Sequence, residues 1–139
     1  MTFIETPSPN FDERKVPPDI VLLHYTGMRT GQEALERLRD PAAKVSSHYL
    51  VEEDGRVFRL VPEERRAWHA GLSFWKGETD INGRSIGIEI VNPGHEFGYR
   101  PFPKAQVAAV IALLADIRSR WMIEDARILG HSDVAPGRK

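Results

Sequence analysis

Cysteine is absent from the 139-residue sequence, so no disulfide stabilises the fold, and a transition metal can be held only by histidine, aspartate or glutamate. The sequence also lacks an apolar run long enough to cross a bilayer, and its N-terminus lacks the basic and apolar regions of a secretory signal. The sequence has no excess of positive charge, since its formal net charge is -1. Neither nucleic acid nor an anionic membrane is therefore expected as a partner. These absences predict an ordinary globular protein in the cytoplasm.

Five short segments predict β-strands. Residues 20–23 are continuously apolar, which is typical of a central strand covered on both faces. Residues 47–52 and 56–61 flank an Asp-Gly pair, which predicts a β-hairpin. Residues 85–91 alternate between isoleucine and other side chains, and residues 127–130 form a last short strand.

Two helices are predicted between these strands. Thr30 and Glu33 have the spacing of a capping box, so a helix should begin there and end before the Asp-Pro pair at 40–41. Pro103 suits the first position of a second helix, which runs to about Met122. Its apolar stripe is expected to pack inward and contains Val107, Val110, Ile111, Leu114, Ile117 and Trp121.

The remaining segments are expected to be irregular. Residues 1–18 are polar and contain proline, which predicts an extended N-terminal arm. Residues 62–83 show no clear period and predict a long surface loop with at most one helical turn; loops of that length are often functional. No repeat or second domain is visible, so residues 19–139 are expected to form a single α/β domain.

Two histidines each follow a predicted strand. His24 comes directly after residues 20–23, and His131 comes directly after residues 127–130. Strand ends present side chains to clefts, and two neutral imidazoles brought together there are two-thirds of a catalytic zinc site. Either histidine can instead be a hydrogen-bonded structural residue, and their spacing in the sequence does not decide between the two interpretations.

Glu89 lies in the middle of the predicted strand 85–91, with isoleucine on either side and Gly87 on its own face. A carboxylate is rarely buried without a partner, and Gly87 leaves room for a substrate or a water molecule. Glu89 is therefore a candidate general base. The alternatives are a solvated glutamate on an edge strand, or one that is paired with a structural arginine.

Other polar residues have both a structural and a functional interpretation. Trp68 and His69 belong to a loop that either is anchored by the tryptophan or forms a wall that binds a sugar or a peptide. Lys139 follows a rigid turn and is either solvated or placed to stabilise an oxyanion. His48 is expected to pack or to support other site residues, and His95 is expected to face solvent.

Five motifs occur in order along the chain. They are LLHYT at 22–26, SHYLV at 47–51 with Asp54-Gly55, AWHAG at 67–71, Asn82 followed by SIGIE at 85–89, and GHSDVAPGRK at 130–139. In this combination the chain resembles the zinc-dependent N-acetylmuramoyl-L-alanine amidases of the type 2 amidase and peptidoglycan-recognition superfamily. The resemblance covers residues 20–139. It implies a mixed central β-sheet with helices packed on its faces, which agrees with the α/β pattern.

The resemblance also implies roles for individual residues. His24 and His131 correspond to zinc ligands, Glu89 to the catalytic acid/base, and Lys139 to the cation near the reacting carbonyl. In the subgroup resembled here, the third ligand is an aspartate two positions after this lysine, and the sequence ends before it. We therefore expect the domain to be incomplete at its C-terminus. Two histidines alone should bind zinc far more weakly than a complete site, which leaves the activity of the chain itself open.

The implied reaction is hydrolysis of the amide that joins the lactyl group of N-acetylmuramic acid to L-alanine of the stem peptide. His69 and Asn82 correspond to residues that line the substrate groove, and Trp68 is expected beside them. The expected partners are peptidoglycan fragments, and the expected cytoplasmic location favours soluble anhydro-muropeptides. Two alternatives stay open: a module that binds muropeptides without cleaving them, and a lytic amidase that acts on the intact cell wall.

Overall fold

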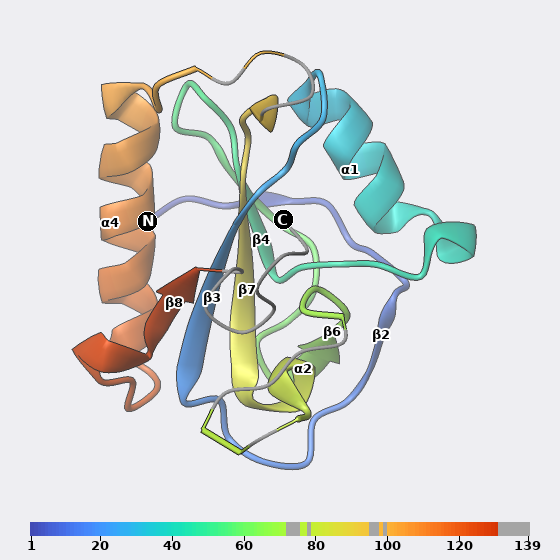
Figure 1. Cartoon of the computed structure of the whole chain (residues 1–139), viewed down its shortest axis with the longest axis vertical. Coiled ribbons are helices and arrows are strands. Elements are labelled where there is room, and N and C mark those ends of the chain that lie inside the picture. Colours follow the sequence, from blue (N-terminus) through green and yellow to red (C-terminus); the bar gives the residue numbers. More distant parts are fainter. Residues whose placement is uncertain (72–75, 78, 95–97, 99, 131–139) are drawn as a thin grey trace.

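A mixed β-sheet forms the centre of the molecule, and helices cover both of its faces (Figure 1), which confirms the expected α/β fold. The computed structural model describes residues 1–71, 76–77, 79–94, 98 and 100–130. Within these residues the sheet has six strands in the order β1-β5-β4-β7-β3-β8. The β4–β5 pair is antiparallel, and the other neighbouring pairs are parallel. The strands span Ile4–Glu5 (β1), Ile20–Tyr25 (β3), Tyr49–Val51 (β4), Val57–Arg59 (β5), Ser85–Ile90 (β7) and Ile128–Gly130 (β8).

The predicted strands are confirmed, and their surroundings explain the sequence pattern. The continuously apolar segment is β3, which lies between β7 and β8. Its residues Ile20, Val21 and Leu22 are fully buried because other elements cover both faces of the sheet. The predicted hairpin is the β4–β5 pair, which is closed by a hydrogen bond from Glu52 N to Arg56 O.

Helix α4 (Lys104–Arg118) packs on one face of the sheet. The buried cluster on this face contains Val21, Tyr49, Val51, Val57, Ile86, Ile88, Leu113, Ile117 and Ile123. Full burial of a side chain of this kind contributes about 1.5–3 kcal/mol. Because Ile86 and Ile88 point toward α4, the alternation in β7 directs Glu89 to the opposite face, as predicted.

The predicted inward face of α4 is wrong at two positions. Val107 and Ile111 are 44% and 63% exposed, whereas the other four residues of the predicted stripe pack toward the sheet. Gln106 is fully buried because its Nε2 donates hydrogen bonds to main-chain carbonyl oxygens at the end of β4 and just after β7. Pro103 is the N-cap residue, one position before the helix begins.

The opposite face of the sheet is covered by several smaller elements. They are helix α1 (Gly31–Arg39), helix α2 (Ile81–Arg84), a two-stranded sheet of β2 (Phe11–Glu13) and β6 (Arg65–Ala67), and 3-10 turn η1 (Pro41–Ala43); a second turn, η2 (Asp125–Arg127), precedes β8. Glu33 N donates a hydrogen bond to Thr30 Oγ1, which confirms the predicted N-cap of α1. Within the described ranges, no helix is both long and apolar enough to cross a membrane.

Residues 62–83 contain more regular structure than the single helical turn predicted, because they include both β6 and α2. Strand β6 pairs with β2, and Arg66 forms ion pairs with Asp12 on β2 and with Asp80 before α2. Strand β2 is exposed along its whole length, and neither strand has an alternating apolar face. The sequence therefore carries no period-2 signal for them.

Within residues 1–18, strand β1 belongs to the central sheet and strand β2 to the two-stranded sheet. Arg14 ties the N-terminal segment to the main chain near the start of β7. Its side chain donates hydrogen bonds to the main-chain carbonyl oxygens of Glu63, Arg65, Gly83 and Ser85. Burial of the guanidinium lowers the pKa of Arg14 to about 10.

A buried carboxylate connects the end of α4 to the sheet. Glu63 is 5% exposed and accepts hydrogen bonds from Tyr49 Oη, from the Arg120 guanidinium and from Trp121 Nε1. Burial alone raises the pKa of the Glu63 carboxyl, but these donors more than offset that effect and hold the pKa below its ordinary value. The helix that covers one face of the sheet is thus tied to the segment after β5.

Candidate active site

His24 and Glu89 lie side by side at the carboxyl ends of β3 and β7. The two residues are partners in the parallel register of these strands, so their side chains leave the same face of the sheet. His24 is 3% and Glu89 is 8% exposed, and His24 Nδ1 lies 3.8 Å from Glu89 Oε2. Because β7 lies between β4 and β3, the alternative that placed Glu89 on an edge strand is wrong.

The imidazole of His69 lies against His24. His69 Nδ1 is 3.0 Å from His24 Nε2, and His69 Nε2 is 3.0 Å from Ser85 Oγ. The His24 and His69 rings meet edge-on, with centroids 5.2 Å apart. A Cβ atom at Gly87 would lie 2.4 Å from His69 Cγ. The expectation that Gly87 leaves room for a substrate is therefore wrong, because the His69 ring occupies that space.

Two side chains hold the loop that carries Trp68 and His69. Asn82 Oδ1 accepts hydrogen bonds from His69 N at 3.0 Å and from Ala70 N at 2.8 Å. Ser46 Oγ accepts from Trp68 N, and Ser46 N donates to Trp68 O. The structure thus places Trp68, His69 and Asn82 together, and it gives Asn82 a contact that fixes the main chain next to His69.

Ser85 is a residue of this site whose role sequence interpretation missed. It is fully buried, and its Oγ lies 2.6 Å from Ile81 O as well as 3.0 Å from His69 Nε2. Ser85 precedes Gly87 and Glu89 by two and four positions, so the alternation of the strand puts all three on one face. That shared face is the sequence signal by which Ser85 could have been found.

Two connected hollows open beside these residues. One has a volume of about 370 Å³ and is lined by Thr26, Gly27, Met28, Ala34, Arg37, Leu38, Val45, Ser46, Trp68, His69 and Glu89. The second has a volume of about 250 Å³ and is lined by Lys44, Val45, Trp68, His69, Ala70, Gly71 and Asn82. The hollows share Val45, Trp68 and His69, and we refer to them together as the groove. Glu89 lines the larger of the two hollows, so a ligand bound there would lie beside it.

His48 is a buried residue that supports the site, as expected from the sequence. It is fully buried, its Nδ1 accepts a hydrogen bond from Gly87 N, and its Nε2 donates to Arg65 O. Both nitrogens are satisfied in the neutral form, and burial lowers the pKa of His48 to about 4. His48 therefore stays neutral at physiological pH and supports the main chain at Gly87.

Three residues singled out from the sequence, His95, His131 and Lys139, lie outside the described residues. The last described residue of β8 is Gly130, which pairs with Leu23, the neighbour of His24. In the part of the chain that the structure describes, no group of three or more histidine, cysteine, aspartate or glutamate side chains is arranged to hold a metal ion. His24 and Glu89 alone would be an incomplete ligand set.

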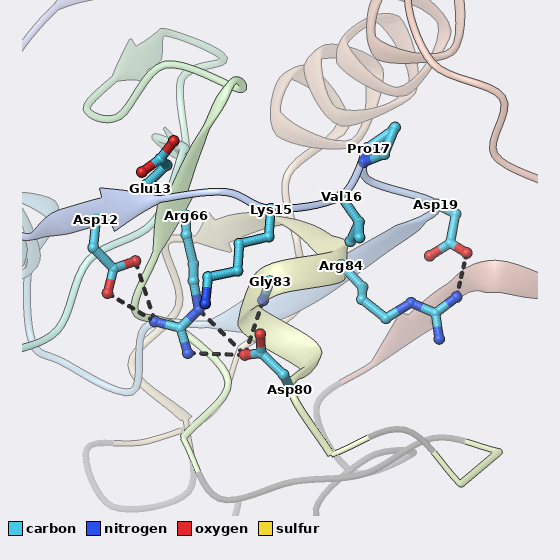
Figure 2. Close-up of a pocket in the computed structure, with 10 residues that line it drawn as sticks. All are labelled: Asp12, Glu13, Lys15, Val16, Pro17, Asp19, Arg66, Asp80, Gly83 and Arg84. Atoms are coloured by element: carbon cyan, nitrogen blue, oxygen red, sulfur yellow. Dashed lines mark hydrogen bonds and ion pairs between the residues drawn. The ribbon is translucent and has the colours of Figure 1, made fainter.

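A larger hollow of about 860 Å³ lies near the opposite ends of the central strands (Figure 2). Its charged side chains bind one another, since Arg66 lies between Asp12 and Asp80 while Arg84 pairs with Asp19. The register places these amino ends four residues from the His24–Glu89 pair, or about 13 Å along the strands. This hollow is therefore separate from the site.

The fold agrees with the comparisons with known proteins. A profile of the family described as N-acetylmuramoyl-L-alanine amidase matches residues 14–139. The chain is 39% identical over 132 residues to N-acetylmuramoyl-L-alanine amidase AmiD of Escherichia coli K12, covering 86% of this chain and 47% of AmiD. It is 34% identical over 152 residues to 1,6-anhydro-N-acetylmuramyl-L-alanine amidase AmpD of Haemophilus influenzae, covering 95% of this chain and 80% of AmpD.

A solved structure of the AmiD relative is also similar to this chain. It is the complex of AmiD from E. coli with the substrate anhydro-N-acetylmuramic acid-L-Ala-D-gamma-Glu-L-Lys. The TM-score is 0.80 at 38% sequence identity, and the match covers 89% of this chain and 52% of the AmiD chain. The chain thus spans about half the length of AmiD and about four-fifths of the AmpD relative.

Proposed function

This chain belongs to the N-acetylmuramoyl-L-alanine amidase family, and on that basis we propose that it hydrolyses the amide bond between N-acetylmuramic acid and L-alanine. The observation that carries the proposal is the pairing of His24 and Glu89, an imidazole and a carboxylate held 3.8 Å apart at the edge of an open groove. A carboxylate beside an imidazole at a pocket is the arrangement that general acid–base catalysis uses. The pair therefore favours an enzyme over a binder.

Zinc is the metal that we propose for this site. His24 and His131 are the proposed ligands, and His24 fits this role because its Nδ1 faces Glu89 while its Nε2 contacts another side chain. His131 directly follows Gly130, whose partner in the sheet is the neighbour of His24. Zinc supplies Lewis acidity, which polarises a carbonyl group and makes water a stronger acid.

Glu89 is the proposed acid/base. Its carboxylate takes a proton from the attacking water as the water oxygen bonds to the lactyl carbonyl carbon. When the carbon–nitrogen bond breaks, Glu89 delivers that proton to the departing amine of L-alanine. The products are a free lactyl carboxylate and a peptide with a free amino group. Lys139 is the proposed cation that stabilises the oxyanion formed between these two steps.

Anhydro-muropeptides are the proposed substrates. The AmpD relative is named for the 1,6-anhydro sugar, and the AmiD relative has been crystallised with an anhydro-muramoyl tripeptide. In the groove, Trp68 contributes an aromatic side chain, Asn82 an amide, and His69 an imidazole whose ring forms part of the wall. We propose that these three residues contact the substrate on either side of the amide. The expected cytoplasmic location stays a prediction, which fractionation of cells expressing the protein would test.

The proposal is tested by identifying the products. Zinc-loaded protein is incubated with anhydro-N-acetylmuramic acid-L-Ala-D-γ-Glu-L-Lys, and mass spectrometry should detect the free anhydro sugar and the free tripeptide. The same protein treated with a chelator and the Glu89→Gln variant should both leave the substrate intact. Binding of the substrate without cleavage would identify a binding module. Cleavage of intact cell wall but not of the soluble fragment would identify a lytic amidase.

A further inference from the structure

The hydrogen bonds that lead from Ser85 through His69 to His24 have a definite direction, because the Ser85 hydroxyl has a single proton to donate. Ser85 Oγ lies 2.6 Å from Ile81 O and 3.0 Å from His69 Nε2. A carbonyl oxygen can only accept, so the hydroxyl proton is donated to Ile81 O. Ser85 Oγ therefore accepts the hydrogen bond from His69, and His69 Nε2 carries a proton.

The direction of this bond sets the next one. A neutral His69 with its proton on Nε2 has a lone pair on Nδ1, which lies 3.0 Å from His24 Nε2. This lone pair accepts, so His24 Nε2 carries a proton, and in the neutral His24 ring that binds a metal Nδ1 has the lone pair. His24 Nδ1 is the atom that lies 3.8 Å from Glu89 Oε2. The lone pair of His24 is thus presented at the catalytic carboxylate.

We infer that Ser85 and His69 are positioning residues that select the tautomer of His24 and present its Nδ1 to the metal. His24 Nε2 donates to His69, His69 Nε2 donates to Ser85 Oγ, and the Ser85 hydroxyl donates to Ile81 O. These bonds form a relay, and of its members only His24 is a proposed zinc ligand. The inference rests on the proposed function, because it assigns the relay a purpose only if this site binds zinc. A ligating histidine commonly donates its second N–H to a neighbouring acceptor, and loss of that acceptor weakens metal binding.

The surroundings of His69 are those of a fixed side chain. Asn82 Oδ1 accepts from the main-chain N–H groups of His69 and Ala70, which sets the position of the His69 backbone. Ser85 is fully buried, and Gly87 leaves the space that the His69 ring fills. Each of these contacts limits rotation of the imidazole. His69 thus has two roles: its ring forms part of the wall of the groove, and its Nδ1 accepts the hydrogen bond from His24.

The first test reads the tautomers directly in the zinc-free protein. Two-bond proton–nitrogen correlation spectra of protein labelled with ¹⁵N-histidine should show both His24 and His69 protonated at Nε2. In Ser85→Ala, His69 should lose its single tautomer, and the signals of His24 should change with it. Ser47→Ala is the matched control, because Ser47 is also fully buried and donates to a main-chain oxygen, that of Tyr49. It should leave both tautomers unchanged.

The second test measures zinc affinity by competition with a chromophoric chelator. His69→Ala removes the acceptor and should weaken zinc binding about 10–100-fold. His69→Asn places an amide oxygen near the position of Nδ1 and should restore much of that loss, which a purely structural role of the ring would not predict. Ser85→Ala should fall between wild type and His69→Ala.

A wild-type spectrum with His24 protonated at Nδ1 would overturn the inference, as would unchanged zinc affinity in both His69→Ala and Ser85→Ala. Equal losses of affinity in His69→Ala and His69→Asn would also contradict it. If wild-type protein bound no zinc, the proposed function would fail, and the assigned purpose of the relay would fail with it. The tautomer spectrum would still report whether the hydrogen bonds run in the stated direction, so the two failures are distinguishable.

Discussion

His24 and Glu89 are register partners on the neighbouring strands β3 and β7, and His24 Nδ1 lies 3.8 Å from Glu89 Oε2. Their separation is therefore set by the main chain of a central sheet rather than by a loop. Sites built on strands hold their geometry more accurately than sites built on loops. Glu89, the proposed acid/base, and His24, the proposed zinc ligand, should consequently keep their relative position when residues of the groove are substituted.

Shortening the proposed catalytic carboxylate should reduce turnover without releasing the metal. Glu89→Asp moves the carboxylate back by one methylene, and general acid–base catalysis is worth about 100–10,000-fold, so kcat should fall by up to that factor. Zinc content, measured by mass spectrometry of the metal, should stay near that of wild type because Glu89 is not a proposed ligand. Undiminished turnover in Glu89→Gln would remove Glu89 from this role.

Gly87→Ala should destabilise the protein through the His69 ring. The new Cβ would lie 2.4 Å from His69 Cγ, and overpacking of this kind costs about 1–3 kcal/mol of unfolding free energy. Urea denaturation of both single variants and the double variant provides a matched control. In a His69→Ala background the same glycine substitution should cost much less. A cost that is independent of residue 69 would show that another contact is responsible.

Stability should fall as the pH decreases from 6.5 toward 4, in part because of His48. Burial lowers the pKa of the folded-state imidazole from 6.5 to about 4, so in this window the unfolded chain binds a proton that the folded chain does not. The unfolding free energy therefore rises with pH across the window. The contribution of His48 to that rise should approach about 3 kcal/mol. Urea denaturation at several pH values should give a flatter profile for His48→Gln, which does not titrate, and an equally steep profile would contradict the assignment.

Glu63→Gln should loosen the contact between α4 and the sheet. The amide cannot accept all of the hydrogen bonds that Tyr49, Arg120 and Trp121 donate, so the unfolding free energy should drop by about 2 kcal/mol. The folded-state pKa of Glu63 is depressed, so its contribution is present above the ordinary carboxyl pKa and is lost as the pH falls through the folded-state value. The difference between wild type and variant should therefore shrink in acid. Glu64→Gln, at an exposed neighbouring position, is the control and should have little effect.

The central strands and α1 could be predicted because their signals are local. The apolar run of β3, the alternation of β7 and the capping residue Thr30 each reflect the environment of a few consecutive residues. Strands β2 and β6 could not be predicted, because they are distant in the sequence and have no alternating apolar face that would signal their pairing. The inward face of α4 was predicted wrongly in part, because Gln106 is buried through hydrogen bonds to main-chain oxygens that no helical periodicity reveals.

The site shows the same division. Its residues belong to recognisable sequence motifs, and His24 and Glu89 are identifiable as candidates because each carries a titratable side chain at or next to a predicted strand. Their pairing depends on the neighbourhood of β3 and β7, which are about sixty residues apart in the chain. The direction of the His69 ring toward Ser85 and Gly87 depends on packing between segments, and no spacing in the sequence encodes it.

The contact between His69 and Gly87 has a consequence for how this domain can diverge. An imidazole at position 69 disfavours any side chain at position 87, because a Cβ atom there would meet the His69 ring. In related sequences aligned to this one, the two positions should change together, as a covarying pair. The amino acids that evolution can accept at position 87 of β7 therefore depend on the residue at position 69.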